Sequence, residues 1–201
     1  MKQLLVIVFA FLLVGCSIKP EPSKPISKLR IEPNFTLHVN KNPSPKVLKV
    51  STPYGLRSIK STDILYTKGD GEYSSYRDSK WEDTPSRQIT RLLSDTLQSA
   101  KIFETVISSS SKIKYDYILE INVKSFEHVL KDEKSYIRLH VNLFLIEALK
   151  KNVLGSYEFK QEVDTPSVNA KGVNKAFGLA MTKLNKESIE WLTDLKNAKL
   201  F

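Results

Sequence analysis

The only cysteine of this 201-residue chain, Cys16, stands at the end of an apolar run near the N-terminus. A cysteine thiolate is a strong nucleophile and can be alkylated. Lys2 supplies a positive start, and residues 4–14 carry no polar side chain. This run is too short for a membrane-spanning helix, which needs about 20 apolar residues. A charged start, a short apolar run and a small residue, here Gly15, are typical of a secretory signal peptide.

The four residues Leu13-Val14-Gly15-Cys16 resemble a bacterial lipobox. In that motif the thiol receives a diacylglyceryl group, the chain is cut before the cysteine, and the new N-terminus is acylated. We therefore predict a signal peptide over residues 1–15, cleavage between Gly15 and Cys16, and covalent lipid (palmitate among its chains) on Cys16. Two or more acyl chains anchor a protein stably, at about 0.8 kcal/mol per buried methylene. The alternative is an ordinary signal peptide, or an uncleaved short anchor, with an incidental cysteine.

The residues after Cys16 predict where the domain lies. Ser17 occupies the position at which serine, unlike aspartate, favours export of a lipoprotein to the outer membrane. Residues 16–30 contain three prolines and predict an extended tether. At about 3 Å per residue, this tether would hold the domain some 30 Å from the lipid. We expect a single periplasmic domain over residues 31–201, anchored in the outer membrane.

The chain is basic, with a formal net charge of +9. Loss of residues 1–15 would remove one lysine and leave +8. The lysines are scattered along the sequence and form no dense run. Nucleic acid is not an expected partner of an exported lipoprotein. The charge therefore predicts solubility and a general attraction to a negatively charged membrane surface.

Two periods in the sequence predict an α+β domain. Apolar residues at helical spacing predict amphipathic helices over residues 85–100 and 168–197. Thr84 is the expected N-cap of the first helix, with Pro85 at its first position. Alternating apolar and polar residues predict strands, which we place over residues 35–39, 47–50, 59–66, 72–76, 103–107, 115–129, 135–149 and 153–163. The expected fold is an antiparallel sheet with both helices packed on one face, in two layers.

One stretch, YSSYRDSKWEDTPSRQITRLLSDTL, leads from a predicted hairpin into the first helix. Its marked residues are Tyr73, Tyr76, Trp81, Glu82 and Pro85. This pattern, the C-terminal NKESIEWL, the order of elements and the lipobox resemble the ABC-type transport auxiliary lipoproteins. The sequence departs from the family pattern where two residues, Asp and Thr, separate the tryptophan-acidic pair from the proline.

The resemblance implies a non-catalytic docking subunit at the outer membrane. Such subunits serve mammalian-cell-entry-type systems, which carry phospholipids between the two membranes. The implied partners are a bridging protein of that type and its ABC permease, and the family also implies a homo-oligomeric ring. Other functions stay open: a lipoprotein that assists an outer-membrane barrel, as in lipopolysaccharide assembly, or a regulator of a peptidoglycan synthase. The predicted tether is short for a regulator that reaches through peptidoglycan.

Two interpretations are open for the motif residues. Trp81, Tyr73 and Tyr76 could form an aromatic contact patch, because such residues are enriched at interfaces. We favour a core position for Trp81, packed against the helix, and leave the tyrosines undecided. Glu82 could pair with a basic residue of a partner, but we favour simple stabilisation of the positive end of the helix.

The titratable residues give little support for catalysis or metal binding. His38, His128 and His140 are the only histidines, and we expect solvated strand positions for them because no further ligands have compatible spacing. Glu127 and Arg138 are expected to pair across a hairpin. Neither a nucleophile elbow nor a P-loop occurs in the sequence. We therefore predict no catalytic residues, no metal site and no cofactor other than the lipid.

Overall fold

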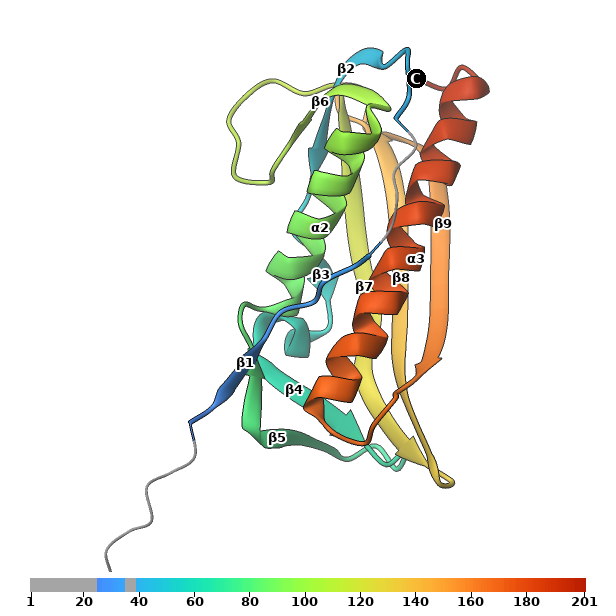
Figure 1. Ribbon diagram of the computed structural model, residues 1–201. Helices are drawn as coiled ribbons and strands as arrows, with labels where there is room; N and C mark the ends of the chain where they lie inside the picture. The colour runs from blue at the N-terminus through green and yellow to red at the C-terminus, as the bar shows by residue number, and fades with distance from the viewer. Residues whose placement is uncertain (1–24, 35–38) are drawn as a thin grey trace, which may run out of the picture.

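The longest strands, β7 (Tyr117–Lys131) and β8 (Lys134–Glu147), form a hairpin along the whole domain (Figure 1). The computed structural model describes residues 25–34 and 39–201. Asp132 and Glu133 connect the two strands with φ angles of 50° and 61°, as a tight two-residue turn requires. β9 (Asn152–Asp164) pairs antiparallel with β8. These three strands confirm the predicted antiparallel meander.

The rest of the sheet corrects the prediction of an antiparallel architecture, because the sheet is mixed. Three short strands pair in turn with the other edge of β7, and all three are parallel to it. They are β2 (Ser44–Val50), β3 (Tyr54–Gly55) and β4 (Asp63–Thr67). Alternation in a sequence shows that one strand face is buried, but it does not report the direction of the neighbouring strand. The parallel pairs therefore went undetected.

Three further strands complete the sheet. β5 (Tyr73–Trp81) pairs antiparallel with β4, as the predicted hairpin required. β6 (Phe103–Ile107) is parallel to β2, and β1 (Ser27–Leu29) is parallel to β5. A short 3-10 helix, η1 (Arg57–Lys60), replaces the first residues of the strand predicted over 59–66.

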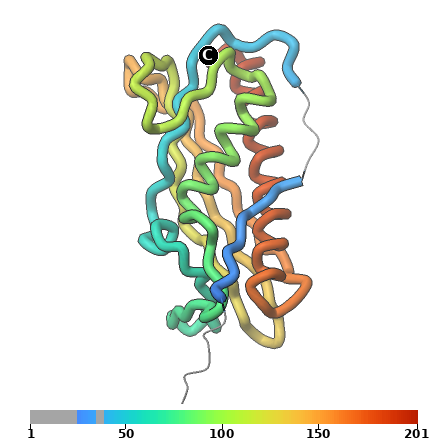
Figure 2. Tube along the Cα trace, turned by 60° about the vertical axis from the view of Figure 1, so that its left-hand side comes forward, coloured from blue at the N-terminus to red at the C-terminus, as the bar shows by residue number. Residues whose placement is uncertain are grey.

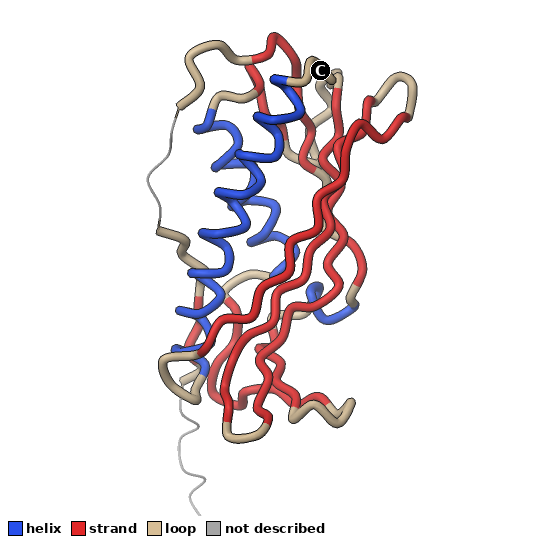
Figure 3. Tube along the Cα trace, turned by 90° about the vertical axis from the view of Figure 1, so that its right-hand side faces the viewer, coloured by secondary structure: helices blue, strands red, loops and turns tan. Residues whose placement is uncertain are grey.

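The two helices, α2 (Pro85–Ala100) and α3 (Ala170–Asn197), cover one face of the curled sheet (Figure 3). Buried apolar residues from both helices and from β2, β7 and β8 form one continuous core between the two layers. The α+β class and the placement of both helices on one face are thus confirmed. The predicted N-cap of α2 differs in detail, because the side chain of Thr84 makes no capping hydrogen bond.

The predicted tether lies partly outside the described residues. Its last part is not free chain, since β1 crosses to the edge of the sheet (Figure 2). Of the strand predicted over residues 35–39, only Val39 is described, and it is not in a strand. None of the helices within residues 25–34 and 39–201 is both long and apolar enough to cross a membrane.

A β-bulge in β7 changes which residues face the core. Val123 lies opposite Val141, but Ser125 lies opposite His140, so Lys124 has no opposing residue. Before the bulge the odd-numbered residues of β7 point to the helices. After it, Phe126 does so instead. A regular alternation continued through the whole strand assigns the wrong face to the residues after position 124.

Close pairing of β3 with β7 depends on Gly55. Its φ is +118°, a conformation that residues with a side chain rarely adopt. A Cβ atom at this position would lie 2.2 Å from the carbonyl oxygen of Val123 in β7. Gly71, in the β4–β5 turn, also has a positive φ, of +88°, but a Cβ atom there would meet no other atom within 4 Å.

We expect Gly55→Ala to destabilise the domain by at least about 2 kcal/mol more than Gly71→Ala, because only the former forces β3 away from β7. The free energy of unfolding from urea titrations checks this. Equal losses in the two variants would show that the β3–β7 contact is not required.

Candidate functional site

The sequence motif from Tyr73 to Pro85 lies where β5 turns into α2. Trp81 is 2% exposed and makes edge contacts with Phe126 and Phe177, at ring-centroid distances of 5.9 and 5.7 Å. Pro85 is buried as well. Trp81 therefore packs β5 against β7 and α3, as we favoured, and neither buried residue offers a free surface to a partner.

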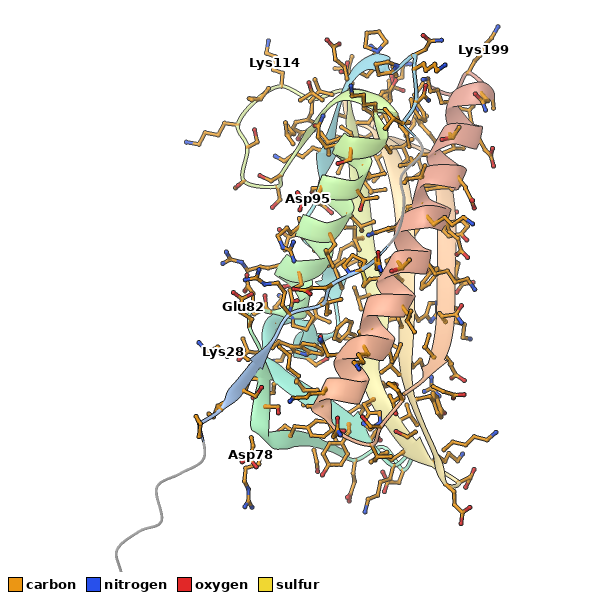
Figure 4. The ribbon with its side chains drawn as sticks, viewed as in Figure 1. Lys28, Asp78, Glu82, Asp95, Lys114 and Lys199 are labelled. Carbon is orange, nitrogen blue, oxygen red and sulfur yellow. The ribbon has the colours of Figure 1, made fainter. Side chains whose placement is uncertain are left out.

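Glu82 lies beside the chain that enters the domain from the tether (Figure 4). Its two carboxylate oxygens accept hydrogen bonds from the Arg30 guanidinium, at 2.8 and 3.1 Å. These bonds lower the pKa of Glu82. The pair is about half exposed, so its contribution to stability is small. Glu82 thus has an intramolecular partner, and the pair holds the segment that follows β1 against the start of α2.

Tyr73 is the exposed end of a polar chain across the sheet. It is 56% exposed, and its hydroxyl donates to the Glu127 carboxylate at 2.7 Å. This hydrogen bond raises the pKa of Tyr73. Arg138 donates to Glu127 at 3.2 Å and to Glu162 at 2.9 Å. The predicted pairing of Glu127 with Arg138 is confirmed, and the chain links β5, β7, β8 and β9.

Tyr76 is half-buried and hydrogen-bonds to His128, for which the predicted solvated position was wrong. His128 is 0% exposed rather than solvated. Its Nδ1 lies 2.9 Å from the Tyr76 hydroxyl, and its Nε2 lies 2.9 Å from the Ser135 hydroxyl. Burial lowers the pKa of His128 to about 4, so the imidazole is neutral at pH 7. Burial also raises the pKa of Tyr76 to about 12, with a smaller effect of Tyr66.

The donors and acceptors in this row of hydrogen-bonded side chains can be assigned from its last member, Thr165. Thr165 donates to the backbone carbonyl of Ser135 at 3.1 Å, because a carbonyl can only accept. The Ser135 hydroxyl also contacts the Thr165 hydroxyl, so Ser135 donates there. Ser135 must then accept from Nε2–H of His128, which leaves Nδ1 to accept from Tyr76. The whole chain is satisfied with one neutral tautomer.

This orientation does not suit catalysis. A histidine that activates a serine must accept the serine proton, whereas His128 donates to Ser135. The Nδ1 side carries a tyrosine rather than an orienting carboxylate. Among the residues that the structure describes, no group of three or more His, Cys, Asp or Glu side chains is placed to hold a metal ion. The geometry supports a structural role that joins β5, β7, β8 and the start of the chain leading to α3.

The bulge explains why the sequence interpretation missed His128. Past Lys124 the even-numbered residues face inward, and His128 follows Phe126 on that side. The apolar Phe126 was the one available signal, because it continues the buried face at a position where strict alternation expects a polar residue.

The free edge of β9 is the other feature able to bind a partner. Within residues 25–34 and 39–201, β9 pairs with β8 alone, so its second edge offers backbone groups along 13 residues. Such an edge can accept an extended segment of another chain. Glu158, Lys160 and Glu162 lie along this strand and would restrict pairing to a segment of matching charge.

The predicted lipidation and cleavage residues, Cys16 and Gly15, lie outside the described residues. They remain predictions from the lipobox.

A family model identifies the family of this chain, and solved structures share its fold. The family model described as ABC-type transport auxiliary lipoprotein component matches residues 33–187. Protein XCC0632 from Xanthomonas campestris has a similar structure over 89% of this chain and 98% of its own, with 20% sequence identity and a TM-score of 0.72. A second solved structure, of an uncharacterized protein, matches 84% of this chain and 99% of its own, at 12% identity and a TM-score of 0.64. A comparison with curated proteins finds no match.

We expect Trp81→Ala to lower the free energy of unfolding by about 3–5 kcal/mol, because it removes a buried aromatic ring that packs edge-on against two others. Leu149→Ala, at a position that is 90% exposed, is the matched control and should change it by less than about 0.5 kcal/mol. Urea titration followed by circular dichroism measures both. A Trp81 variant as stable as the control would contradict the core assignment.

His128 should make stability depend on pH. Its pKa is lower in the folded than in the unfolded chain, so the unfolded chain binds more protons between about pH 6.5 and pH 4. Above pH 6.5 the free energy of unfolding is therefore not reduced by protonation of His128. It decreases as the pH falls from 6.5 to about 4. Between pH 7 and pH 5 we expect a loss of about 2 kcal/mol from this residue.

Urea titrations of the wild type and of His128→Gln across this pH range measure that loss. The variant should be less stable at pH 7 and should show a flatter pH profile, since the carboxylates titrate alike in both proteins. Parallel profiles would exclude a buried neutral histidine.

Proposed function

We propose, from the premise that this chain belongs to the ABC-type transport auxiliary lipoprotein family, that it is a docking subunit of a lipid transport system. The family itself supports a non-catalytic lipoprotein in transport. We further propose that the protein acts in a mammalian-cell-entry-type system that carries phospholipid between the two membranes of the envelope. ATP hydrolysis then belongs to another subunit.

The observation that carries this proposal is the family match over residues 33–187, which spans nearly all described elements. The internal chemistry supports it. Tyr73 and Tyr76 of the motif hydrogen-bond to Glu127 and His128 of β7, so these polar groups join strands of the sheet. Among the described residues, the second edge of β9 has no paired strand and is available to a partner.

The lipid on Cys16 would confine the domain to the outer membrane, facing the periplasm. Confinement raises the local concentration of neighbouring subunits, so that weak contacts suffice for assembly. Strand addition at β9 is the contact we propose, either with the bridging protein or between copies of this chain. Repeated head-to-tail contacts of the second kind close a ring if the rotation closes.

Photo-crosslinking in the native envelope tests the docking role. A photoreactive residue at Ser156, exposed on β9, should capture a mammalian-cell-entry-type protein together with its permease, or a second copy of this chain. The same residue at Leu179, 62% exposed on α3, is the control and should capture neither. Mass spectrometry identifies the products.

Two results would contradict the proposal. Recovery of an outer-membrane barrel or a peptidoglycan synthase from the β9 position would assign the fold to a different envelope task. Capture of the transport proteins from the α3 position alone would keep the system and exclude the β9 edge.

A further inference from the structure

Five chain segments meet at the end of the domain that lies away from β1 (Figure 1). Backbone hydrogen bonds join Asn40 to Ala100, and Ala148 to Asp116. The C-terminal Phe201 ring packs on Tyr117, with 5.5 Å between ring centroids. The segments are residues 39–43, 101–102, 108–116, 148–151 and 198–201. We call this surface the lysine end.

Lysines that are scattered in the sequence gather at the lysine end. Figure 4 shows two of them, Lys114 and Lys199, at the same end of the molecule. Seven lysines are exposed there: Lys41, Lys101, Lys112, Lys114, Lys150, Lys151 and Lys199. Nearby acids are fewer, and two of them are already paired, Asp116 with Lys46 and Glu147 with Lys150. The surface therefore carries a clear positive excess.

The position of some of these lysines has a simple local cause. Lys101 and Lys199 follow the C-terminal ends of α2 and α3, where a positive charge is favourable. No such cause applies to Lys112 and Lys114 in the β6–β7 loop, or to the lysines of the β8–β9 turn.

Each of three segments also exposes an apolar side chain beside its lysines. Ile113 is 62% exposed between Lys112 and Lys114. Leu149 is 90% exposed and is followed by two lysines. Leu200 is 45% exposed and follows Lys199. Apolar tips framed by lysines suit the boundary of a bilayer, where the apolar group enters the acyl region and the ammonium groups meet anionic headgroups.

The basic residues of the lysine end are all lysines, which favours a lipid surface over a protein as the binding partner. Arginine is enriched and lysine depleted at protein interfaces. The arginines of this chain, at positions 30, 57, 77, 87, 91 and 138, all lie outside the lysine end. Lysine is a compact point charge that needs no planar partner, and its long stem can lie along apolar surface while the charge stays in water.

We propose that the lysine end binds the surface of an anionic phospholipid bilayer, with Ile113 and Leu149 inserted at the headgroup boundary. This contact is independent of the acyl anchor and of the docking role of β9. It gives the domain a second point of attachment to a membrane.

The tether limits how the domain can make this contact. From Gly178, beside Glu32, α3 continues for about 28 Å to its C-terminal end. The five residues back to Ser27 lead roughly 15 Å further from the lysine end. The chain from Cys16 to Ser27 spans at most about 40 Å. If the long axis of the domain stood perpendicular to the membrane with the lysine end on the bilayer, Ser27 would lie slightly further from the lipid than this chain can span. The anchored domain must therefore tilt to place the lysine end on its own membrane.

Vesicle binding by an unacylated variant, Cys16→Ser with the signal peptide absent, tests the proposal. This chain keeps every helix and strand that the structure describes. It should bind vesicles of phosphatidylglycerol mixed equally with phosphatidylcholine, and not vesicles of phosphatidylcholine alone. Replacing Lys112, Lys114, Lys150 and Lys151 by Gln should reduce partitioning at least about ten-fold.

A second four-lysine variant controls for net charge. Lys60, Lys134, Lys160 and Lys171 are exposed but lie elsewhere, and their change to Gln removes the same charge. This variant should bind within about two-fold of the parent. Equal losses of vesicle binding in the two variants would show only a non-specific attraction between the net positive charge and the anionic vesicles. This result would overturn the assignment to the lysine end.

Insertion has its own readout, because Cys16→Ser leaves no cysteine in the chain. A polarity-sensitive dye on Leu149→Cys or Ile113→Cys should shift to the blue on the anionic vesicles. The same dye on Leu179→Cys or Val168→Cys, which are comparably exposed, should not. Absence of a shift at both lysine-end positions, or of any vesicle binding, would refute the contact with lipid and leave an acidic protein as the occupant.

Discussion

A strand of fifteen residues at the centre of a sheet needs hydrogen-bond partners along both edges, and β7 meets this need in two different ways. On one edge β8 pairs with it over its whole length. On the other edge β2, β3 and β4 follow one another, each covering a few residues. The rest of the fold adapts to this arrangement. Gly55 allows the short middle strand to approach, and α2 supplies the crossover that parallel neighbours require.

The bulge at Lys124 ties this backbone pattern to the buried polar chain. By turning the second half of β7 over, it brings Phe126 against Trp81 and places His128 within reach of Tyr76. The marked residues of β5 therefore have structural roles within the domain. Trp81 fills the core, and Tyr76 hydrogen-bonds to the buried imidazole of His128. These residues stabilise the junction of β5, β7 and α2 from within, which leaves the outward surfaces available for contacts with other molecules.

The elements with a strong period were predictable from the sequence. The helix Pro85–Ala100 and the strand Phe103–Ile107 have the bounds that the pattern predicted. The strands β7 and β8 form the predicted hairpin, with Glu127 opposite Arg138 as expected. Strand direction, the bulge and the burial of His128 were not predictable, since none of them alters the local alternation that a sequence displays. The clustering of lysines was hidden for a related reason, because loops far apart in the chain meet only in the folded domain. The predicted lipid on Cys16 rests on the sequence alone.

The two contacts that we propose use separate outward features of the domain: the edge of β9 for another protein, and the lysine end for a membrane surface. Amide hydrogen exchange along Asn152–Asp164 tests the central claim, that β9 is the docking edge, most directly. In the isolated protein, the amides on the free edge should exchange rapidly. In the assembly recovered from the envelope, the same amides should be protected. Unchanged exchange in β9, with new protection elsewhere on the domain, would contradict docking by strand addition.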